Sequence, residues 1–315
     1  MKRLLATSLV ALAAAVFAAA AFAADPPPVT PFPSAHSGDV FVIAETTTDT
    51  GAVAAYYKPG ATVYFRAYAV DGKTRTVLTP SARIRGKTVK VVRDFYVKLP
   101  NGDGTFSKLK FKYTPKSRLA SGNYRWTAAW NVPATYPEGI VNFKVVARTY
   151  SRHFGSFVQV PIATAMLTIS NKAPDPGTGP TVGAPPSGKV TIGLYADAVN
   201  SPRPPAAAPR PIGCTQTNVF KRGERMVIRA WGFDLLTGNV LSMDNVVNAH
   251  FTVPGQPDVT LNWGAHGAVG NKVWFWAAGW SVPTNYPLGD VVVKVSFTLD
   301  TGKVGTFDYP ITILP

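Results

Sequence analysis

Hydrophobic and polar residues alternate with a period of two along most of the chain beyond residue 38. Runs rich in Val, Ile, Phe, Tyr and Thr are separated by Gly, Pro, Asn and Asp, a pattern that predicts β-strands joined by turns. In the first half of the chain these runs are 40–45, 62–71, 96–99, 106–113, 124–132, 140–148 and 157–169. In the second half they are 190–196, 225–234, 250–253, 259–263, 272–282, 291–299 and 305–313. Apart from the apolar N-terminal stretch, no long segment has helical spacing, so the sequence predicts an all-β fold.

The chain also contains an internal repeat. Segment 126–139, WTAAWNVPATYPEG, recurs at 276–289 as WAAGWSVPTNYPLG. Upstream, KPG and RAY within 58–68 are matched by KRG and RAW within 221–231. The interval between these landmarks is longer in the first half. Two copies are too few for a solenoid, so we expect two separate domains that arose by duplication.

The order of elements in each half indicates a sandwich. Each half offers about seven short strands with turn signals between them. A Tyr-Pro-x-Gly turn, at 136–139 and again at 286–289, leads into a Val-rich strand. This pattern resembles bacterial immunoglobulin-like and fibronectin-III-like modules, although the Cys…Trp…Cys signature of antibody-type domains is absent. The resemblance implies two tandem immunoglobulin-like β-sandwich domains. Such modules serve adhesion, scaffolding, sugar binding and accessory roles, so the fold does not select a function.

The N-terminus is typical of a secretory signal peptide. Met1-Lys2-Arg3 precedes an apolar stretch that ends in Ala-Phe-Ala at 21–23, so we expect cleavage after Ala23. An uncleaved membrane anchor is the alternative, and an Ala-rich stretch is weakly apolar for that role. No Cys follows the expected cut, which disfavours a lipid anchor. We therefore expect a periplasmic or extracellular protein with no transmembrane segment after cleavage.

The composition of the connecting stretches sets the expected domain boundaries. Residues 24–37 are Pro-rich, and 170–188 form a Pro/Gly linker with no apolar periodicity. The predicted domains are therefore 38–169 and 189–315, and a third Pro-rich stretch, 200–211, is expected to be a loop of the second domain. Cys214 is the single cysteine, which excludes an intrachain disulfide. We interpret it as a partly buried loop residue, with a reactive thiol or an intermolecular bridge as alternatives.

Charge is distributed unevenly along the chain. The whole sequence has 32 Lys and Arg against 17 Asp and Glu. Segment 38–169 holds 19 basic and 7 acidic residues, whereas 187–315 holds 10 and 8. Because nearly all of the excess lies in the first domain, a partner selected by charge would bind there.

Within the first domain, segment 83–118 concentrates the basic residues. Alternation with apolar residues places the charges of 83–87 and of 108–112 on one face of each predicted strand, and the two rows would adjoin if these strands are neighbours. The structural interpretation is a solvated face or an edge strand that lysines protect against pairing with another chain. The functional interpretation is a docking surface for an anion-rich partner. Its candidate anion-binding residues are Arg83, Arg85, Lys87, Lys90, Lys108, Lys110 and Lys112.

Paired tryptophans are the second ordered feature. Each repeat contains a Trp-x-Ala-x-Trp motif, formed by Trp126 and Trp130 in the first half and by Trp276 and Trp280 in the second. Residues two apart on a strand share a face, so each pair points one way with a small residue between its rings. We interpret the pairs as inter-sheet core. An exposed aromatic platform for sugar rings is the alternative.

Signatures of catalysis are not found in the sequence. It has no nucleophile elbow, no phosphate-binding P-loop, no His-Glu-x-x-His and no haem-attachment motif, so no catalytic residue and no cofactor is nominated. A copper-type site would need convergent imidazole and thioether ligands, and only His250 and His266 fall close together. We therefore nominate no metal site either. The residues weighed for it were His36, His153, His250, His266, Met166, Met226 and Met243.

These observations favour an exported, non-enzymatic binding or scaffolding protein whose basic first domain docks an anionic partner. Candidate partners are anionic polysaccharide, lipopolysaccharide and acidic protein. Extracellular nucleic acid would be bound without sequence readout, because Lys-rich strands with few interleaved aromatic residues favour diffuse charge recognition. The alternatives are an accessory subunit of an exported redox or hydrolytic enzyme, and a carbohydrate-binding module that uses the Trp pairs.

Overall fold

The computed structural model describes residues 39–114, 126–159, 163–179, 188–201, 212–266 and 272–315. Regular structure in these ranges is almost entirely β-strand, with one short 3-10 helix at Ala163–Ala165. No helix within the same ranges is long and apolar enough to cross a membrane. The expected signal peptide, the Pro-rich segment 24–37 and most of the predicted loop 200–211 lie outside the described residues.

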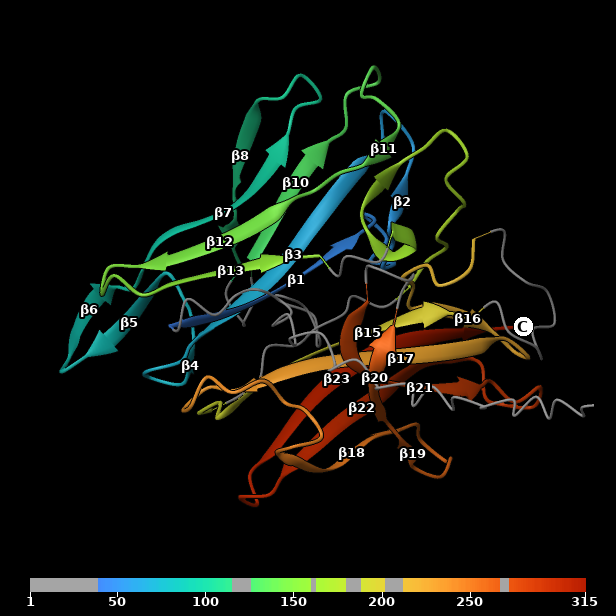
Figure 1. Cartoon of the computed structure of the whole chain (residues 1–315). Helices are drawn as coiled ribbons and strands as arrows, with labels where there is room; N and C mark the ends of the chain where they lie inside the picture. Colours follow the sequence, from blue (N-terminus) through green and yellow to red (C-terminus); the bar gives the residue numbers. More distant parts are fainter. Residues whose placement is uncertain (1–38, 115–125, 160–162, 180–187, 202–211, 267–271) are drawn as a thin grey trace, which may run out of the picture.

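Three sheets and a hairpin make up the first half of the chain (Figure 1). The first sheet has the order β1-β3-β10-β9 with β4 beside β3, the second is β13-β12-β7-β8, the third is the small sheet β11-β14-β2, and β5 pairs only with β6. The strands are β1 Val40–Thr47, β2 Tyr56–Tyr57, β3 Thr62–Asp71, β4 Thr76–Val77, β5 Ser81–Ile84, β6 Lys87–Lys90, β7 Val92–Pro100, β8 Phe106–Lys110, β9 Lys112–Tyr113, β10 Trp126–Asn131, β11 Gly139–Ile140, β12 Lys144–Thr149, β13 Phe154–Val158 and β14 Thr168–Ile169.

Two sheets make up the second half, in the orders β15-β17-β21-β20 and β16-β23-β22-β18-β19. Their strands are β15 Ile192–Asn200, β16 Val219–Lys221, β17 Arg225–Asp234, β18 Val246–Thr252, β19 Val259–Thr260, β20 Asn262–His266, β21 Val273–Ser281, β22 Gly289–Leu299 and β23 Val304–Leu314. Among the described residues, each sheet takes its strands from one half of the chain, and Ala54 and Thr217 form an isolated bridge between the halves.

In each half the two large sheets face each other across an aromatic core. The rings of Phe95 on β7 and Trp126 on β10 have centroids 5.0 Å apart. In the second half the rings of Trp276 on β21 and Phe297 on β22 lie 5.4 Å apart. The protein is therefore all-β, with sheet-on-sheet packing in both halves.

The repeated sequence segments make the same contacts in both halves. The indole N–H of Trp126 donates to the Leu78 carbonyl at 3.1 Å, as that of Trp276 donates to the Leu241 carbonyl at 2.7 Å. The hydroxyls of Tyr136 and Tyr286 donate to the carbonyls of Pro100 and Pro254. Each of these tyrosines also packs edge-on against the second tryptophan of its motif, Trp130 or Trp280. The repeat therefore preserves a buried tryptophan whose indole N–H is hydrogen-bonded, and a tyrosine whose hydroxyl donates to a backbone carbonyl of another segment.

The two halves pack against each other through their first strands, β1 and β15 (Figure 1). The ring of Phe41 on β1 lies 6.0 Å from that of Phe233 on β17, and Tyr195 on β15 packs edge-on against Phe157 on β13. A Cβ at Gly193 would lie 2.8 Å from the Phe41 ring, so a glycine is required there. Because the buried apolar residues of both halves form one continuous cluster, the halves share a core across this interface.

Candidate anion-binding surface

The outer face of the sheet β13-β12-β7-β8 carries the best candidate site. On β7 the side chains of Phe95, Val97 and Leu99 are buried, so Tyr96 and Lys98 between them point outward. On the edge strand β8, Lys108 and Lys110 are exposed.

Strand pairing brings three lysines into one row. Lys98 on β7 is directly opposite Lys144 on β12 and, on its other side, directly opposite Lys108 on β8. Neighbouring strands are ~4.8 Å apart, so the row crosses three strands at that interval. In the next row Lys110 lies opposite Tyr96. Lys98, Lys144 and Tyr96 were not among the sequence candidates, because only the register of three strands shows that they adjoin Lys108 and Lys110.

Aromatic rings contact two of these cations. The Lys98 ammonium lies 3.9 Å from the centroid of the Phe106 ring, and that of Lys108 lies 5.3 Å from the Tyr96 ring. These cation–π contacts restrict side chains that would otherwise be mobile in solvent. The prediction of few aromatic residues among the basic ones was therefore wrong for this face. The rings come from other strands or strand ends, and a single run of sequence does not show them together.

Negative charge near the row is scarce and already engaged. Asp94 is the one acidic residue within the described strands β7, β8, β12 and β13, and its carboxylate pairs with the Nε of Arg93 at 3.1 Å. Asp103, in the turn between β7 and β8, accepts hydrogen bonds from the Thr105 hydroxyl and backbone N–H. These bonds lower the pKa of Asp103. Neither carboxylate is paired with a lysine of the row, so the face stays positive.

The hairpin β5–β6 holds four of the candidate residues. Arg85 and Gly86 both have positive φ, 48° and 78°, which is the geometry of a two-residue type I′ turn. Arg83, Arg85, Lys87 and Lys90 are all exposed. The prediction that Arg83, Arg85 and Lys87 share one face was wrong. The turn at Arg85 reverses the chain, and Lys87 pairs with Ile84 on the face opposite Arg83.

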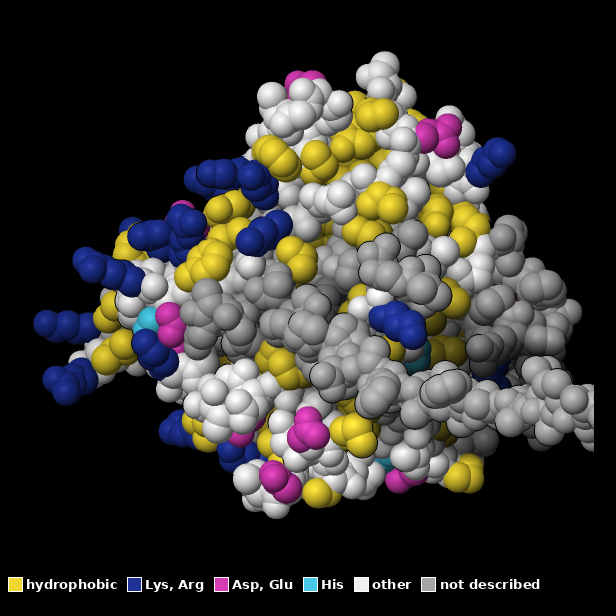
Figure 2. All heavy atoms as spheres, viewed as in Figure 1, with side chains coloured by type: hydrophobic (Ala, Val, Ile, Leu, Met, Phe, Trp, Pro, Cys, Tyr) yellow, Lys and Arg dark blue, Asp and Glu magenta, His cyan; other side chains and the backbone are white. Residues whose placement is uncertain are grey.

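The remaining candidate, Lys112, lies on a different sheet from its sequence neighbours. Phe111 is buried, and beyond it the chain pairs with β10, where Lys112 is opposite Thr127. The prediction that Lys108, Lys110 and Lys112 form a single row was therefore wrong. The segments 83–90 and 108–112 also do not pair with each other. Figure 2 nevertheless shows Lys and Arg side chains gathered along one side of the first half, toward the end that holds the hairpin.

The tryptophan motifs lie largely inside the sandwiches. Trp126, Trp276 and Trp280 are 5%, 6% and 8% exposed, and Trp130 is half-buried against the core. This placement favours the interpretation as core over an exposed sugar platform.

Histidine and methionine side chains are spread over the described part of the chain, and no group of three or more His, Cys, Asp or Glu side chains that could hold a metal ion occurs there. His153 contacts Asp71 at 2.7 Å, whereas His266 stacks on the Phe275 ring. Met226 is buried and Met243 is 70% exposed. His36 lies outside the described residues.

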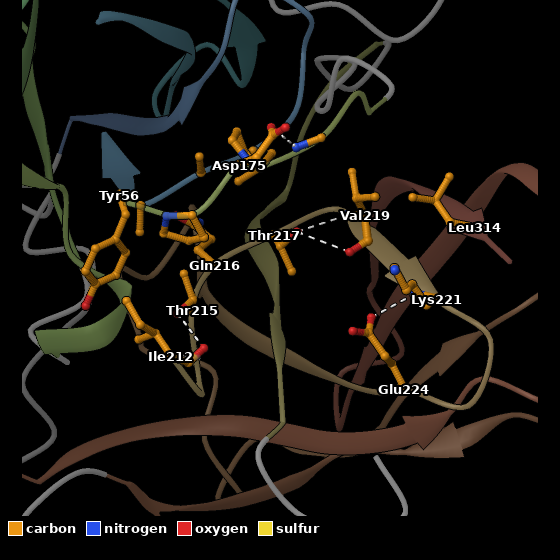
Figure 3. Close-up of a pocket in the computed structure, with 16 residues that line it drawn as sticks. Tyr56, Asp175, Ile212, Thr215, Gln216, Thr217, Val219, Lys221, Glu224 and Leu314 are labelled. Atoms are coloured by element: carbon orange, nitrogen blue, oxygen red, sulfur yellow. Dashed lines mark hydrogen bonds between the residues drawn. The ribbon is translucent and has the colours of Figure 1, made fainter. Parts of the chain in front are cut away.

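A cleft of about 450 Å³ opens between the two halves (Figure 3). It is lined by Ala54, Ala55 and Tyr56, by Gln216 and Val219, and by Leu314. Its two carboxylates bind backbone: Asp175 accepts from the Gly177 N–H and Glu224 from the Lys221 N–H. Both carboxylates thus support the local backbone, and the lining is mainly apolar.

Comparisons with known proteins return no family model and no match among curated proteins. Solved structures do match. Fibronectin(III)-like modules of Clostridium thermocellum CbhA are 12% identical, with 86% of this chain and 94% of that chain covered and a TM-score of 0.20. The C-terminal domain of the Streptococcus agalactiae AgI/II polypeptide BspA is 10% identical over 86% and 100% of the two chains, with a TM-score of 0.20. SGBP-B of a Bacteroides ovatus mixed-linkage glucan utilization locus was solved in complex with a mixed-linkage heptasaccharide. It is 10% identical, with 88% of this chain and 61% of that chain covered and a TM-score of 0.17.

Similarities at these TM-scores carry no inference about function. The sheets described above are themselves those of immunoglobulin-like and fibronectin-III-like β-sandwich modules, without assignment to a particular family.

Proposed function

We propose that this chain is an exported, non-enzymatic binding or scaffolding protein whose first half docks an anionic partner. The docking surface is the outer face of the sheet β13-β12-β7-β8. The observation that carries the proposal is the row of Lys144, Lys98 and Lys108, directly opposite one another on three neighbouring strands. Export is supported by the signal-like N-terminal sequence.

The energetics of the row favour a functional role. Like charges directly opposite each other on neighbouring strands destabilise a sheet. A lysine on the edge strand β8 can be explained by protection against edge-to-edge pairing, but Lys98 is on an interior strand, where no such protection is needed. An anion that spans the row would relieve the repulsion and release its own counterions, so binding should weaken steeply with salt.

Retention of the mature chain, residues 24–315, on immobilised heparin across a salt gradient tests the proposal. The test variant carries Lys98→Gln, Lys108→Gln and Lys110→Gln. The matched control carries Lys189→Gln, Lys272→Gln and Lys294→Gln, which remove the same charge from exposed lysines of the second half. We expect the test variant to elute at clearly lower salt than the wild type, and the control variant to elute close to it.

Equal shifts in the two variants would show that retention follows net charge alone, and the docking surface would be rejected. Elution of the wild type without retention at low salt would reject the anionic partner as well.

A further inference from the structure

We propose that the hairpin β5–β6 is a second docking element, which enters the surface of an anionic phospholipid bilayer. Figure 1 shows the hairpin at one end of the first half, where it projects beyond the large sheets. It leads into the start of β7, whereas Lys98 of the lysine row lies near the end of that strand. The proposal therefore concerns a different surface from the proposed function and does not depend on it.

The sandwich fold does not require this hairpin. It belongs to the connection 72–91 between β3 and β7. The equivalent connection of the second half, 235–245 between β17 and β18, is shorter and contains no hairpin strands, yet both sheets of that half form. Among the described strands, β5 and β6 pair only with each other. Because an isolated two-stranded hairpin is at best marginally stable in water, contact with a partner would add to its stability.

Strand register gives the hairpin one apolar face. Ala82 is directly opposite Val89, and Ile84 is two residues from Ala82 on the same strand, so these three side chains point the same way. Ile84 and Val89 are 53% and 42% exposed. They are diagonal neighbours on that face, and both would gain free energy on entering an apolar layer.

Cations surround the apolar face. Arg83 and Lys90 lie on the opposite face of the hairpin, and Lys87 is at the margin of the apolar one. Arg85 is in the turn, at a position where a type I′ turn favours Asn, Asp or Gly, so the turn geometry does not account for an arginine there. All four side chains are exposed, and the hairpin contains no acidic residue.

The turn between β12 and β13 extends the same surface. The Tyr150 N–H donates to the Val91 carbonyl at 2.9 Å, which places this turn beside the base of the hairpin. Tyr150 and Arg152 are both exposed. Each has an apolar part and a polar end, which suits the boundary between lipid headgroups and acyl chains. In Figure 2, Lys and Arg side chains at this end of the molecule lie among hydrophobic ones.

This combination of side chains fits a bilayer better than a rigid partner. A bilayer has an apolar layer directly beneath a layer of negative charge, so aliphatic side chains can enter it while neighbouring cations stay at the level of the headgroups. The cations lie on both faces and at the tip of the hairpin, so one flat anionic surface would meet only some of them. Lipids can rearrange around a projecting hairpin and meet them all. A polysaccharide offers charge without the apolar layer.

Flotation of the mature chain with lipid vesicles tests the proposal. The vesicles contain phosphatidylcholine alone, or phosphatidylcholine mixed with phosphatidylglycerol. We expect much tighter binding to the mixed vesicles, weakening as salt rises. Ile84→Thr with Val89→Thr should lower partitioning about tenfold. Val247→Thr with Val304→Thr, at exposed positions of the second half, should leave it unchanged.

A second pair of variants tests the cations. Arg83→Gln, Arg85→Gln and Lys87→Gln together should lower partitioning about a hundredfold at low salt. The second-half control variant of the heparin experiment removes the same charge and should have a much smaller effect. Equal effects of the two variants would show that binding follows net charge, and the hairpin would be rejected as the docking element.

A fluorophore at position 84 distinguishes entry into the bilayer from adsorption on its surface. Ile84→Cys is made in a Cys214→Ser background, since Cys214 is exposed and free, and is labelled with an environment-sensitive dye. We expect blue-shifted emission with the mixed vesicles, and quenching by lipids brominated on their acyl chains. The same label at Val247 should show neither change.

The remaining outcomes are equally definite. Vesicle binding that is lost in the charge variant but kept in the threonine variant, with no change at the label, would overturn insertion. Equal binding to phosphatidylcholine alone would overturn the preference for anionic lipid. Absence of binding to both kinds of vesicle would reject the bilayer in favour of a protein partner. The threonine variant keeps every charge, so its elution from heparin should match the wild type, and failure of either proposal is distinguishable from failure of the other.

Discussion

At the scale of single residues, Glu45 is the least satisfied polar group at the interface between the halves. Its side chain is 1% exposed, and neither carboxyl oxygen has a hydrogen-bond partner among the described residues. At the matching position of the second half, Asp197 binds Arg229 through both of its oxygens. Burial first, and then the Asp197 charge, raise the pKa of Glu45 well above its ordinary value of 4.5, while Arg66 opposes them. These effects favour the neutral acid form of Glu45.

A raised pKa in the folded state gives stability a definite pH dependence. The folded chain keeps the Glu45 proton after the unfolded chain has lost it, so the contribution of Glu45 to stability is greatest at low pH. It falls as pH rises from about 4.5 toward the folded-state pKa, by up to about 1.4 kcal/mol per pH unit. Glu45→Gln removes this titration. We expect the stability of the variant relative to the wild type to be higher at about pH 8 than at about pH 5 in urea unfolding. The same difference at both pH values would show that Glu45 does not titrate in this way.

The tryptophan motifs give a second prediction at this scale. Trp280 is 8% exposed and packs against Tyr286, so Trp280→Ala should cost about 3–5 kcal/mol of unfolding free energy. Trp130→Ala should cost less, because Trp130 is only half-buried. Denaturant unfolding measures both. A loss below about 1 kcal/mol at Trp280 would indicate an exposed ring and would restore the sugar-platform hypothesis.

At the scale of elements, like-charge repulsion in the lysine row should lower the stability of its sheet. Removing the central charge relieves two like-charge contacts, so Lys98→Gln should stabilise the unliganded chain by about 0.2–1 kcal/mol at low ionic strength. Added salt should stabilise the wild type more than the variant, because it screens the same repulsion. Thermal unfolding at two salt concentrations checks this. Destabilisation by Lys98→Gln at low salt would mean that the cation–π contact of the Lys98 ammonium with the Phe106 ring outweighs the like-charge repulsion.

Much of the strand pattern could be predicted, because alternation is a property of each strand by itself. The strands at 62–71 and 225–234 have the predicted bounds in the structure. Segment 106–113 was predicted as one strand and is two, since the buried Phe111 marks the point where the chain moves from one sheet to the other. Pairing could not be predicted in the same way. The sequence therefore predicted only part of the candidate surface. Lys108 and Lys110 follow from the alternation of residues, whereas Lys98 and Lys144 are found only from the register of the paired strands.

At the scale of the whole molecule, the two halves are joined by a buried interface as well as by the linker 170–188. The sequence predicts two self-sufficient domains, and the sheets do take their strands from one half each. However, β15 is buried along its whole length, and Phe41, Phe233 and Tyr195 fill the contact between the halves. Sequence periodicity cannot show this contact, since a strand buried on both faces has the same apolar residues whichever element covers it.

We therefore expect the halves to stay together after the linker is cut. Cleavage within 170–188 should give two fragments that co-elute in gel filtration, because separation would expose the apolar surface around Phe41 and Phe233. Gly193→Val, which would place side-chain atoms against the Phe41 ring, should release the fragments from each other. Separate, folded fragments from the cleaved wild type would contradict a shared core.

The central claim, that the row on β8, β7 and β12 meets an anionic partner, is tested most directly by lysine footprinting. The mature chain is acetylated with and without saturating polyanion, and the modification of each lysine is measured by mass spectrometry. The account predicts strong protection of Lys98, Lys108 and Lys144, with Lys272 and Lys294 unchanged. Uniform protection of lysines in both halves, or none in the row, would contradict it.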